Sequence, residues 1–480
     1  MRKYVALAFV VLGAAVIWSG SSVAAQQSAS AAPTPTFNKD IAPILYANCT
    51  TCHRAGEVAP MSLMTYKDAR PWARSIAAKV ADGTMPPWHA DPQYGKFKNE
   101  RRLTDAQKAT VAKWVAAGAP EGNAADLPAA PAYTTSEWNI GKPDVVLSMQ
   151  EDYPIPATGD VPYQYFEVPA NFAEDRYIQS WEIKPGDRAA VHHIIVQTLA
   201  PKDVADQQMK QMQQAVMQRF LAPKAAPGAP AQQRQLPLLT FACCTNIPAG
   251  QTGGPPLPKD QQKPLGPADR PRPAGTGPSV GGYVPGNSVR VFPEGTAMRL
   301  PAGYSLVFQM HYTTYGKATT DRSKMGLKFA TTKPSIVLNT ATIINGSLDI
   351  PAQAANHEVD ADVTINRDIM LYSLVPHTHV RGKRWLYEAT YPDGRKEVLL
   401  SVPNYDFNWQ HEYVYDQPVK IPAGTKLHAS AWYDNSPANK SNPDPTKNVK
   451  WGDQTWEEMM YTSMTFFLPP TPQTAAGQKH

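Results

Sequence analysis

Two histidines that lie two residues apart, His377 and His379, follow a short apolar run rich in β-forming residues. The run from Leu371 to Val375 predicts a buried strand that ends at Pro376. Because alternate side chains of a strand share one face, His377 and His379 should point the same way and could bind a transition metal together. For a pair of histidines alone, one solvated ring and one ring with a buried hydrogen bond would be the simpler interpretation.

The same part of the chain contains further side chains that bind copper well, and they change this balance. They are two adjacent histidines, a histidine in a β-rich run and a methionine after two glutamates: His192, His193, His311 and Met459. Adjacent residues of a flat strand face opposite ways, so the adjacent pair could share a metal only at a bulge or a strand end. Met460 is an alternative to Met459, and core packing is the ordinary role of either. We expect the other histidines of this region to be structural or solvated, namely His357, His411 and His428.

A separate chemical signature stands near the N-terminus, at Cys49-Thr50-Thr51-Cys52-His53. In this C-x-x-C-H pattern the two thiols attach haem c covalently, and the histidine takes an axial position on the iron. A redox-active cysteine pair or half of a zinc site is disfavoured, because no second pair lies nearby. The motif therefore predicts one covalently bound haem c.

The residues around this motif, over about 37–122, resemble a small class I cytochrome c. Asn38 is the expected cap of a first helix, and Thr104 to Gln107 has the capping-box pattern of a last helix. The resemblance implies that these two helices pack together.

The resemblance also implies that a methionine between the two helices is the second axial ligand. Gly83-Thr84-Met85-Pro86-Pro87-Trp88 resembles the loop that presents it, so we expect Met85 in this role. Met61, Met64 and His89 are alternatives. A thioether ligand raises the reduction potential of haem iron and suits electron transfer.

Residues 1–25 are typical of a signal peptide that is removed. They combine Arg2 and Lys3 with an apolar run and end in Val23-Ala24-Ala25. The apolar run is short for a bilayer span, so an uncleaved anchor is the less favoured alternative. We therefore expect an exported protein, periplasmic or secreted, without a stable membrane span after cleavage.

The chain changes character after an Ala- and Pro-rich linker at 123–140. Short β-rich runs broken by Pro, Gly and Asp then predict antiparallel sandwiches, for example at 144–149, 163–168, 177–183, 191–198 and 304–314. The same Pro-Ala-Gly turn recurs at 300–304 and 421–425, which indicates two related sandwiches at 141–332 and 333–470. The expected fold class is multidomain, with a small all-α cytochrome c domain followed by two all-β, jelly-roll-like sandwich domains.

Residues 223–285 are dense in Pro, Gly and Gln and predict an irregular excursion, either a lid or a cover between domains. Cys243 and Cys244 lie within it, and a vicinal disulfide, two buried thiols or a cross-link between chains all fit the sequence. A helix is expected before it, at 203–220. The methionines of that helix more often indicate core packing than copper handling.

Composition limits the partners of the protein. The net charge is only +5, and no Lys/Arg cluster alternates with aromatic residues, so nucleic acid is not an expected partner. Four cysteines exclude a fold held by several disulfides.

In their order along the chain, the candidate ligands are similar to those of a known family. His192-His193, His311, His377-Thr378-His379 and Met459 resemble the pattern of the type II copper, ascorbate-dependent monooxygenases, the peptidylglycine α-hydroxylating and dopamine β-monooxygenases. The resemblance covers about 141–468. It implies one copper on His192, His193 and His311, and a second, catalytic copper on His377, His379 and Met459. The donor chemistry agrees, because imidazoles accept both oxidation states of copper and a thioether favours Cu(I).

The chain also departs from this family. The peptide-amidating members carry an arginine two residues before the His-Thr-His motif, where this chain has Val375, and a tyrosine after the copper methionine, where it has Ser463. The many disulfides of the family are missing as well. A peptide with a free carboxylate is therefore not the expected substrate. Arg381 and Lys383 follow the motif and would face either a substrate or solvent.

These features together predict an exported copper monooxygenase that hydroxylates a C–H bond of a small organic substrate with O2. Electrons would reach copper through the tethered haem from an ascorbate-like reductant or a periplasmic redox protein. The alternative is a haem c and copper electron-transfer protein without oxygenase activity. A copper-homeostasis module is less favoured, because no Met- or His-rich tract occurs outside 203–220.

Overall fold

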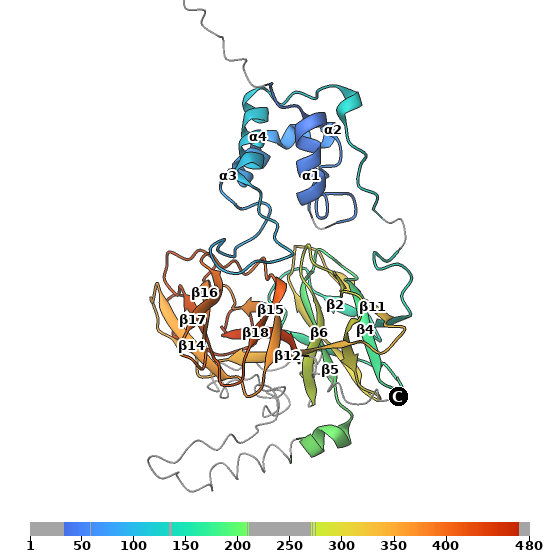
Figure 1. The fold of residues 1–480 in the computed structure, drawn as a ribbon, viewed down its shortest axis with the longest axis vertical. Coiled ribbons are helices and arrows are strands. Elements are labelled where there is room, and N and C mark those ends of the chain that lie inside the picture. The colour runs from blue at the N-terminus through green and yellow to red at the C-terminus, as the bar shows by residue number, and fades with distance from the viewer. Residues whose placement is uncertain are drawn as a thin grey trace, which may run out of the picture.

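The computed structural model describes residues 33–57, 59–133, 137–208, 210, 270, 272–273 and 275–469. A helical N-terminal unit stands on two β units that lie side by side (Figure 1). The expected signal peptide, the pair Cys243 and Cys244, and most of the expected helix at 203–220 lie outside the described residues. Residues 202–208 of that helix are helical.

The helical unit is built from short helices. They are η1 (Phe37–Ile41), α1 (Ala42–Asn48), α2 (Tyr66–Ala69), η2 (Arg70–Trp72), α3 (Ala73–Ala81), α4 (Asp105–Ala116) and η3 (Ala124–Asp126). The predicted capping box of α4 is confirmed, because the Thr104 side chain accepts from Gln107 N while the Gln107 side chain accepts from Thr104 N. The first and last helical segments pack together, with the buried rings of Phe37 and Trp114 6.3 Å apart.

The expected cap of the first helix is wrong. Helix η1 begins two residues earlier than predicted, and Thr36 caps it by accepting a hydrogen bond from Lys39 N. Asn38 is buried instead, and its side chain donates to the carbonyl oxygens of Gly122 and Asn123. Asn38 therefore ties the first helical segment to the chain that follows α4.

The helical unit is not the independent tethered domain that the sequence led us to expect. Trp88, Ala90 and Phe97 belong to the core of the second β unit. Phe97 forms a β-bridge with Tyr415, and the neighbouring backbone bonds continue this pairing. The segment between α3 and α4 therefore joins the helical unit to the second β unit through buried apolar contacts.

The linker at 123–140 also packs against the helical unit and the first β unit. Near its middle, the Tyr133 hydroxyl lies 2.5 Å from the hydroxyl of Thr50, in the C-x-x-C-H motif. At its end Trp138 is buried, and Asn139 donates its backbone and side-chain N–H groups to the Glu182 carboxylate of the first β unit.

The β units contain the strands that the alternating runs predicted, within a few residues. The first unit contains β1 (Val145–Ser148), β2 (Tyr153–Ile155), β3 (Gln164–Val168), β4 (Arg176–Lys184), β5 (Val191–Leu199), β6 (Thr276–Tyr283), β7 (Val289–Val291), β8 (Thr296–Leu300), β9 (Ser305–Tyr312), β10 (Thr319–Asp321) and β11 (Lys324–Phe329). The second contains β12 (Ile336–Ile344), β13 (Asp349–Ile350), β14 (His357–Thr364), β15 (Ile369–His377), β16 (Gly382–Thr390), β17 (Lys396–Val402), β18 (Tyr413–Ile421), β19 (Lys426–Tyr433), β20 (Val449–Lys450) and β21 (Tyr461–Phe467). Strand β6 corrects the expected irregular excursion at 223–285, whose last residues are a regular part of the first unit.

The two β units have the same strand order and share one sheet. The shared sheet runs β1-β11-β4-β8 in the first unit and continues β12-β21-β15-β18 in the second, through the parallel pair of β8 and β12. Each unit adds a four-stranded sheet, β3-β9-β5-β6 in the first and β14-β19-β16-β17 in the second. Strand β7 pairs only with β4 and has no counterpart in the second unit; when it is left out of the count, the two orders correspond strand for strand.

The repeated Pro-Ala-Gly turn has the same structure in both units. Gly303 and Gly424 have φ values of +75° and +87°, which glycine adopts without strain. The alanine before each glycine donates its backbone N–H to an aspartate carboxylate, Ala302 to Asp175 at 3.0 Å and Ala423 to Asp368 at 2.9 Å. This correspondence supports the prediction of two related units.

Strand β15 is longer than the predicted run, because it continues through Pro376 to His377. Strand β18 pairs with β15 only as far as Leu374, so this end of β15 has β21 as its one paired neighbour. Proline is tolerated in a strand at such an edge.

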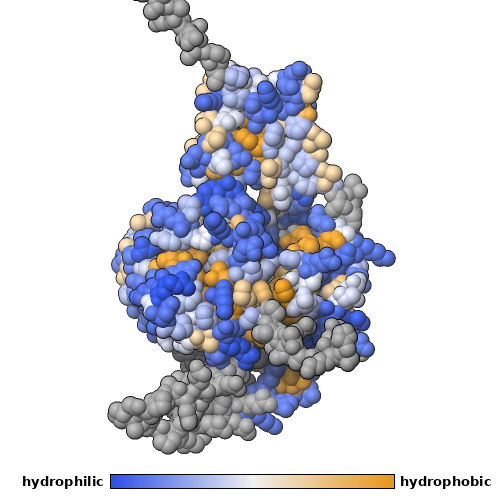
Figure 2. Space-filling view, viewed as in Figure 1, coloured by the Kyte–Doolittle hydropathy of each residue, from blue (hydrophilic) through white to orange (hydrophobic). Residues whose placement is uncertain are grey.

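The apolar side chains of the β units lie mainly inside, in one core per unit. The face in Figure 2 is predominantly hydrophilic, with hydrophobic residues in small separate patches. Among the described helices, none has the length and apolar character needed to cross a membrane.

Candidate metal centre

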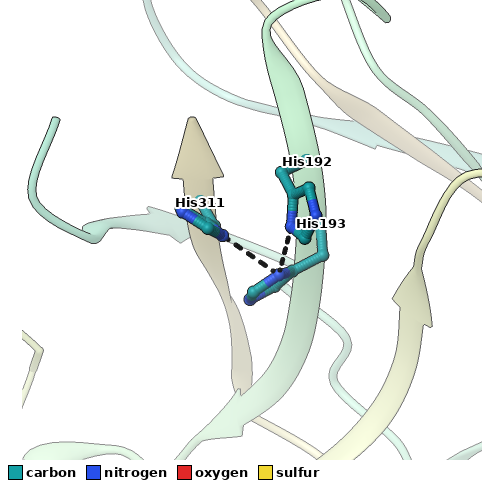
Figure 3. A group of neighbouring side chains, drawn as sticks. All are labelled: His192, His193 and His311. Carbon is teal, nitrogen blue, oxygen red and sulfur yellow. Dashed lines mark hydrogen bonds between the residues drawn. The ribbon is translucent and has the colours of Figure 1, made fainter. Parts of the chain in front are cut away.

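Three histidines of the first β unit converge at one point. His193 and His311 are direct partners across the adjacent strands β5 and β9. The register shifts between Val191 and His193, which is the bulge that the adjacent histidines require. His192 therefore turns to the same side, and the ligand atoms of His192, His193 and His311 all lie within 4.8 Å of one another (Figure 3).

The Nδ1 atoms of this set face inward. His193 Nδ1 lies 3.2 Å from His192 Nδ1 and 3.3 Å from His311 Nδ1, while His311 Nε2 lies 2.9 Å from the Thr455 hydroxyl. Three ring nitrogens that face one another cannot all be satisfied by each other's protons, but one cation would accept all three lone pairs. Burial lowers the pKa of His192 to about 4 and the pKa values of His193 and His311 well below their usual range, which keeps the rings in the neutral, metal-binding form.

The two histidines of the second β unit present the opposite nitrogen. His377 Nδ1 lies 2.8 Å from Gln410 Oε1, and His379 Nδ1 lies 3.2 Å from the carbonyl oxygen of Glu457. Both Nδ1 atoms then carry the proton, which leaves Nε2 as the free lone pair of each ring. The buried Nε2 of His379 has no hydrogen-bond partner among the described residues. With ring centroids 5.3 Å apart, both histidines belong to one set, as the His-Thr-His spacing predicted.

A buried carboxylate connects this pair to Met459. Glu458 Oε2 accepts hydrogen bonds from the backbone N–H groups of His379, at 2.7 Å, and Met459, at 3.2 Å. Glu458 Oε1 accepts from Arg381 N at 2.7 Å. One side chain therefore fixes the chain after β15 and the chain before β21 against each other.

The alternation along β21 distinguishes Met459 from Met460. Met460, Thr462 and Met464 are alternate residues, and all three are buried within the second β unit. Met459 alternates with Tyr461, and Tyr461 is the direct partner of His377 in the sheet. Both methionines precede β21 and are buried in the core of the second β unit, so the alternation favours Met459 as the candidate ligand without placing its sulfur beside the histidines.

The two sets of candidate ligands lie against each other at the junction of the β units. The rings of His193 and His377 have centroids 6.2 Å apart. Phe407 of the second unit stacks on His192, with ring centroids 5.0 Å apart. The ring centroid of Tyr163, in the first unit, lies 5.5 Å from that of His193 and 6.4 Å from that of His379. Every histidine of the two sets therefore contacts aromatic side chains in one continuous buried cluster.

Sequence reasoning missed the residues that orient these histidines. They are single polar or aromatic residues without a recognisable spacing: Tyr163, Phe407, Gln410, Thr455 and Glu458. Only Glu458 carried a signal, since it directly precedes the candidate methionine in a buried β-rich context.

One other expectation about this region needs correction. Arg381 does not face a substrate, because it is 2% exposed and bonds Asn435 Oδ1 and the Trp456 carbonyl oxygen. Lys383 lies at the surface and donates to the Ala355 carbonyl oxygen. Of the histidines expected to be structural, His411 is buried beside Trp88, and His428 pairs with Asp362.

The C-x-x-C-H motif continues directly from α1. Its backbone is wound in helical turns, with Cys49 N donating to Leu45 O and His53 N to Cys49 O. Cys49 and Cys52 are not joined in a disulfide. His53 Nδ1 lies 3.3 Å from the Met61 carbonyl oxygen, which orients the ring and leaves Nε2 free for an iron ion. The residues present therefore fit covalent haem.

The expected second axial ligand, Met85, follows α3 and is half-buried. Its backbone N–H donates to the carbonyl oxygen of Lys79 at 3.0 Å, which folds the loop back on the helix. The alternative ligand His89 packs against His411 of the second β unit, at 5.9 Å between ring centroids.

The haem motif itself contacts the first β unit. A Cβ atom at Gly286 would lie 2.9 Å from Cys52 Sγ, so only glycine fits there without movement. Glu57, just after the motif, pairs with Arg188 of the first unit at 2.8 Å. Gly286 is in the turn that the bridge between Val284 and Asn287 closes, directly after β6.

No family model matches the chain. No curated protein matches it. Among solved structures, the chain is similar to a structure of infectious bursal disease virus Gx strain, with 12% identity over 68% of this chain and 67% of that chain and a TM-score of 0.17. It is also similar to the crystal structure of the infectious bursal disease virus VP2 subviral particle, with 10% identity over 70% of this chain and 83% of that chain and a TM-score of 0.13. Similarities this weak say nothing about the function of the chain.

Proposed function

We propose that the protein is an exported copper monooxygenase that hydroxylates a small organic molecule, with electrons supplied through its own haem c. The balanced reaction takes one substrate C–H bond, O2, two electrons and two protons, and gives the C–OH product and one water. The observation that carries the proposal is the pair of adjoining ligand sets, one with three inward Nδ1 atoms and one whose Nδ1 atoms are held by acceptors, with Met459 tied to it through Glu458.

The donor sets fit two copper ions of different character. Copper supplies O2 activation and one-electron storage when bound, and covalent haem supplies single electrons. His192, His193 and His311 would hold one copper, and His377, His379 and Met459 the other. The sulfur donor favours the reduced metal, so the Met459 set is the better place for O2 chemistry.

The rest of the chain orients these ligands. Gln410 and the Glu457 carbonyl oxygen hold His377 and His379 in one tautomer, and the Thr455 hydroxyl, which can donate or accept, orients the ring of His311. Such partners fix the ring orientation and raise ligand basicity. Glu458 sets the spacing between His379 and Met459 through its two backbone hydrogen bonds.

The position of the haem motif supports electron supply within the chain. Gly286 packs on Cys52, while its neighbours Tyr283, Val284 and Asn287 line the same cavity as His193 and His377. One turn of the first β unit therefore separates the haem attachment site from the candidate copper ligands. The two electrons of each cycle would otherwise have to come from a free reductant such as ascorbate.

The finer description of the fold belongs to the same proposal. The helical unit is proposed to be a cytochrome c domain, with His53 and Met85 as the axial pair. The two β units are proposed to be jelly-roll-like sandwiches of the copper monooxygenase type, each with two sheets in corresponding order. The signal peptide at 1–25 is proposed to direct the protein to the periplasm or the medium.

An electron-transfer protein without oxygenase activity is the second candidate. It is favoured by one observation, the burial of most of the ligand cluster, since His379 is fully buried and His193 is 1% exposed, although His192 is only half-buried. A metal that only exchanges electrons needs no substrate access.

An isotope experiment separates the two candidates. The copper-loaded protein is reduced, freed of excess reductant, and exposed to 18O2 with a panel of small organic molecules. The proposal predicts one 18O atom in a hydroxylated product, lost in His379→Ala but kept in the matched control His428→Ala, whose histidine lies at the surface. Reoxidation of haem and copper without any 18O-labelled product would support the electron-transfer protein.

A further inference from the structure

A cavity of about 170 Å³ lies at the junction of the β units and touches both candidate ligand sets. One wall comes from β5 and β6 of the first unit, with His193 on it, and the other from β15 and β21 of the second, with His377 on it. The chemistry of its lining predicts what it can bind.

The wall of the second unit is set by strand alternation. Val375 and His377 are alternate residues of β15, and each faces its direct partner on β21, Ser463 and Tyr461. Val375 and Ser463 therefore lie about 7 Å from the His377 pair along the strands. Neither of them offers a charge or a long donor to a ligand.

The charges of the lining cancel. Apart from histidines, its charged residues are Arg290 and Glu412, which form an ion pair with each other across the two β units. Their side chains are 18% and 20% exposed, so they are largely withdrawn from water. A charged ligand would lose its hydration without gaining a free counter-charge, which is strongly unfavourable.

The size of the cavity sets an upper limit on the ligand. An engineered apolar cavity of about 150 Å³ binds benzene, so a space of this order holds one six-membered ring with a short substituent. Trp181, Phe292 and Met298 supply apolar surface, and the backbone of Gly281 and Gly282 forms a wall without side chains.

We infer that this cavity is the binding site for a small, uncharged, largely apolar organic molecule of about one ring in size. The role of this molecule as the hydroxylated substrate rests on the proposed function, whereas its binding does not. The inference excludes both a peptide carboxylate and a free amine cation as the preferred ligand.

Equilibrium dialysis of the full-length haem protein, with and without copper, tests the site. The probes are toluene and benzyl alcohol as neutral molecules, phenylacetate as an anion and benzylamine as a cation. The neutral probes should bind at least about tenfold more tightly than either charged probe, since a tenfold difference needs only about 1.4 kcal/mol. Equal binding of charged and neutral probes, or no binding of any probe, would overturn the inference.

Variants of the two facing residues locate the binding. Ser463→Phe and, from the opposite strand, Val375→Phe should each weaken toluene binding at least about tenfold by filling the space. His428→Ala, whose histidine lies outside the cavity, should leave it within about threefold. Val375→Arg should reverse the preference in favour of phenylacetate. Unchanged toluene binding in both filled variants, with circular dichroism showing a folded protein, would place the ligand elsewhere.

The copper content of the same samples keeps the two proposals apart. Selective binding of neutral probes in a protein that takes up no copper would leave the cavity assignment in place and end the monooxygenase proposal. Normal copper uptake without selectivity for neutral probes would end the cavity assignment alone.

Discussion

The two β units correspond in strand order and in their Pro-Ala-Gly turn, but they carry their candidate ligands on different strands. The first unit places its histidines on β5 and β9, in its four-stranded sheet. In the second unit His377 ends β15, His379 follows it and Met459 precedes β21, and both strands belong to the shared sheet. In strand order, β5 and β9 correspond to β16 and β19, where the one histidine, His428, pairs with aspartates at the surface.

This difference shows that the ligand cluster is a property of the junction and not of the repeated fold. Each unit also supports the ligands of the other. Thr455 of the second unit contacts His311 of the first, and Phe407 stacks on His192. In the reverse direction, Tyr163 of the first unit lies beside His379. The repeat provides two scaffolds, and their contact provides the site.

The largest loss of stability expected from a single substitution arises in the second unit. Glu458→Ala would leave the buried N–H groups of His379, Arg381 and Met459 without their acceptor. At about 1–3 kcal/mol for each unsatisfied group, and with partial relaxation, we expect a loss of about 3–5 kcal/mol in the free energy of unfolding. Urea denaturation measures it.

Among the residues that the structure describes, no carboxylate links the candidate ligands of the first unit in this way, so Glu458→Ala should also separate the two sets. Copper analysis of the folded variant should show loss at the His377 set with retention at the His192 set. Loss of less than about 1 kcal/mol would mean that water replaces the carboxylate and that the two sets are held alike.

The helical unit should depend on the two β units to different degrees. Phe97 is buried in the second core, so Phe97→Ala should cost about 3–5 kcal/mol in the free energy of unfolding. Arg188 of the first unit contributes a partly exposed ion pair with Glu57, so Arg188→Ala should cost no more than about 1 kcal/mol. Equal effects in chemical denaturation would show that the helical unit is attached evenly to both units.

Substitution of a residue that orients a histidine ring should weaken metal binding at only one of the two ligand sets. Thr455→Val removes the partner of His311 Nε2, and Gln410→Leu removes the partner of His377 Nδ1. Loss of such a partner typically weakens metal binding about 10–100-fold. Competitive chelator titration should find two copper affinities, with only the weaker or only the tighter one changed in each variant. A change of both affinities in either variant would mean that the two sets bind as one.

A smaller effect is expected from pH on the metal-free protein. Burial lowers the pKa of both His192 and His377 to about 4, one histidine in each unit. Between about pH 4 and 6.5 the unfolded chain therefore binds more protons than the folded chain, and the free energy of unfolding falls as the pH falls. The slope is at most about 1.4 kcal/mol per pH unit for each buried histidine.

Denaturation of the metal-free protein at a series of pH values measures this slope. His377→Leu should reduce it, and so should His192→Leu by a similar amount, since burial acts alike on both units. A slope that does not change in either variant would show that these histidines are not the groups that titrate.

The sequence predicted the strands better than their assembly. Hydrophobic alternation is local, so runs such as 191–198 and 304–314 could be recognised, and the bulge at His192 followed from two adjacent histidines that share a role. The shared sheet could not be recognised, because the parallel pairing of β8 with β12 depends on contacts between distant residues. The same holds for Phe97, whose loop looks polar in sequence but inserts one ring into a distant core.

The candidate ligands could be recognised in the sequence, but their surroundings could not. Histidine and methionine in a β-rich context carry a chemical signal in their residue type. Gln410 and Thr455 do not, because amides and hydroxyls occur in every loop, and only the fold brings them to a ring nitrogen. The closeness of His193 to His377 also follows from the packing of the two units and from no feature of either segment.

The most direct test of the account is the copper-to-haem ratio of the mature protein, compared with His377→Ala, His193→Ala and the control His428→Ala. The account predicts two coppers per haem in the wild type and the control, and about one in each of the other variants, because each change dismantles one three-ligand set. A protein with haem but no copper after reconstitution would contradict it. A single copper lost completely in either variant would contradict it as well, since the two sets would then form one site.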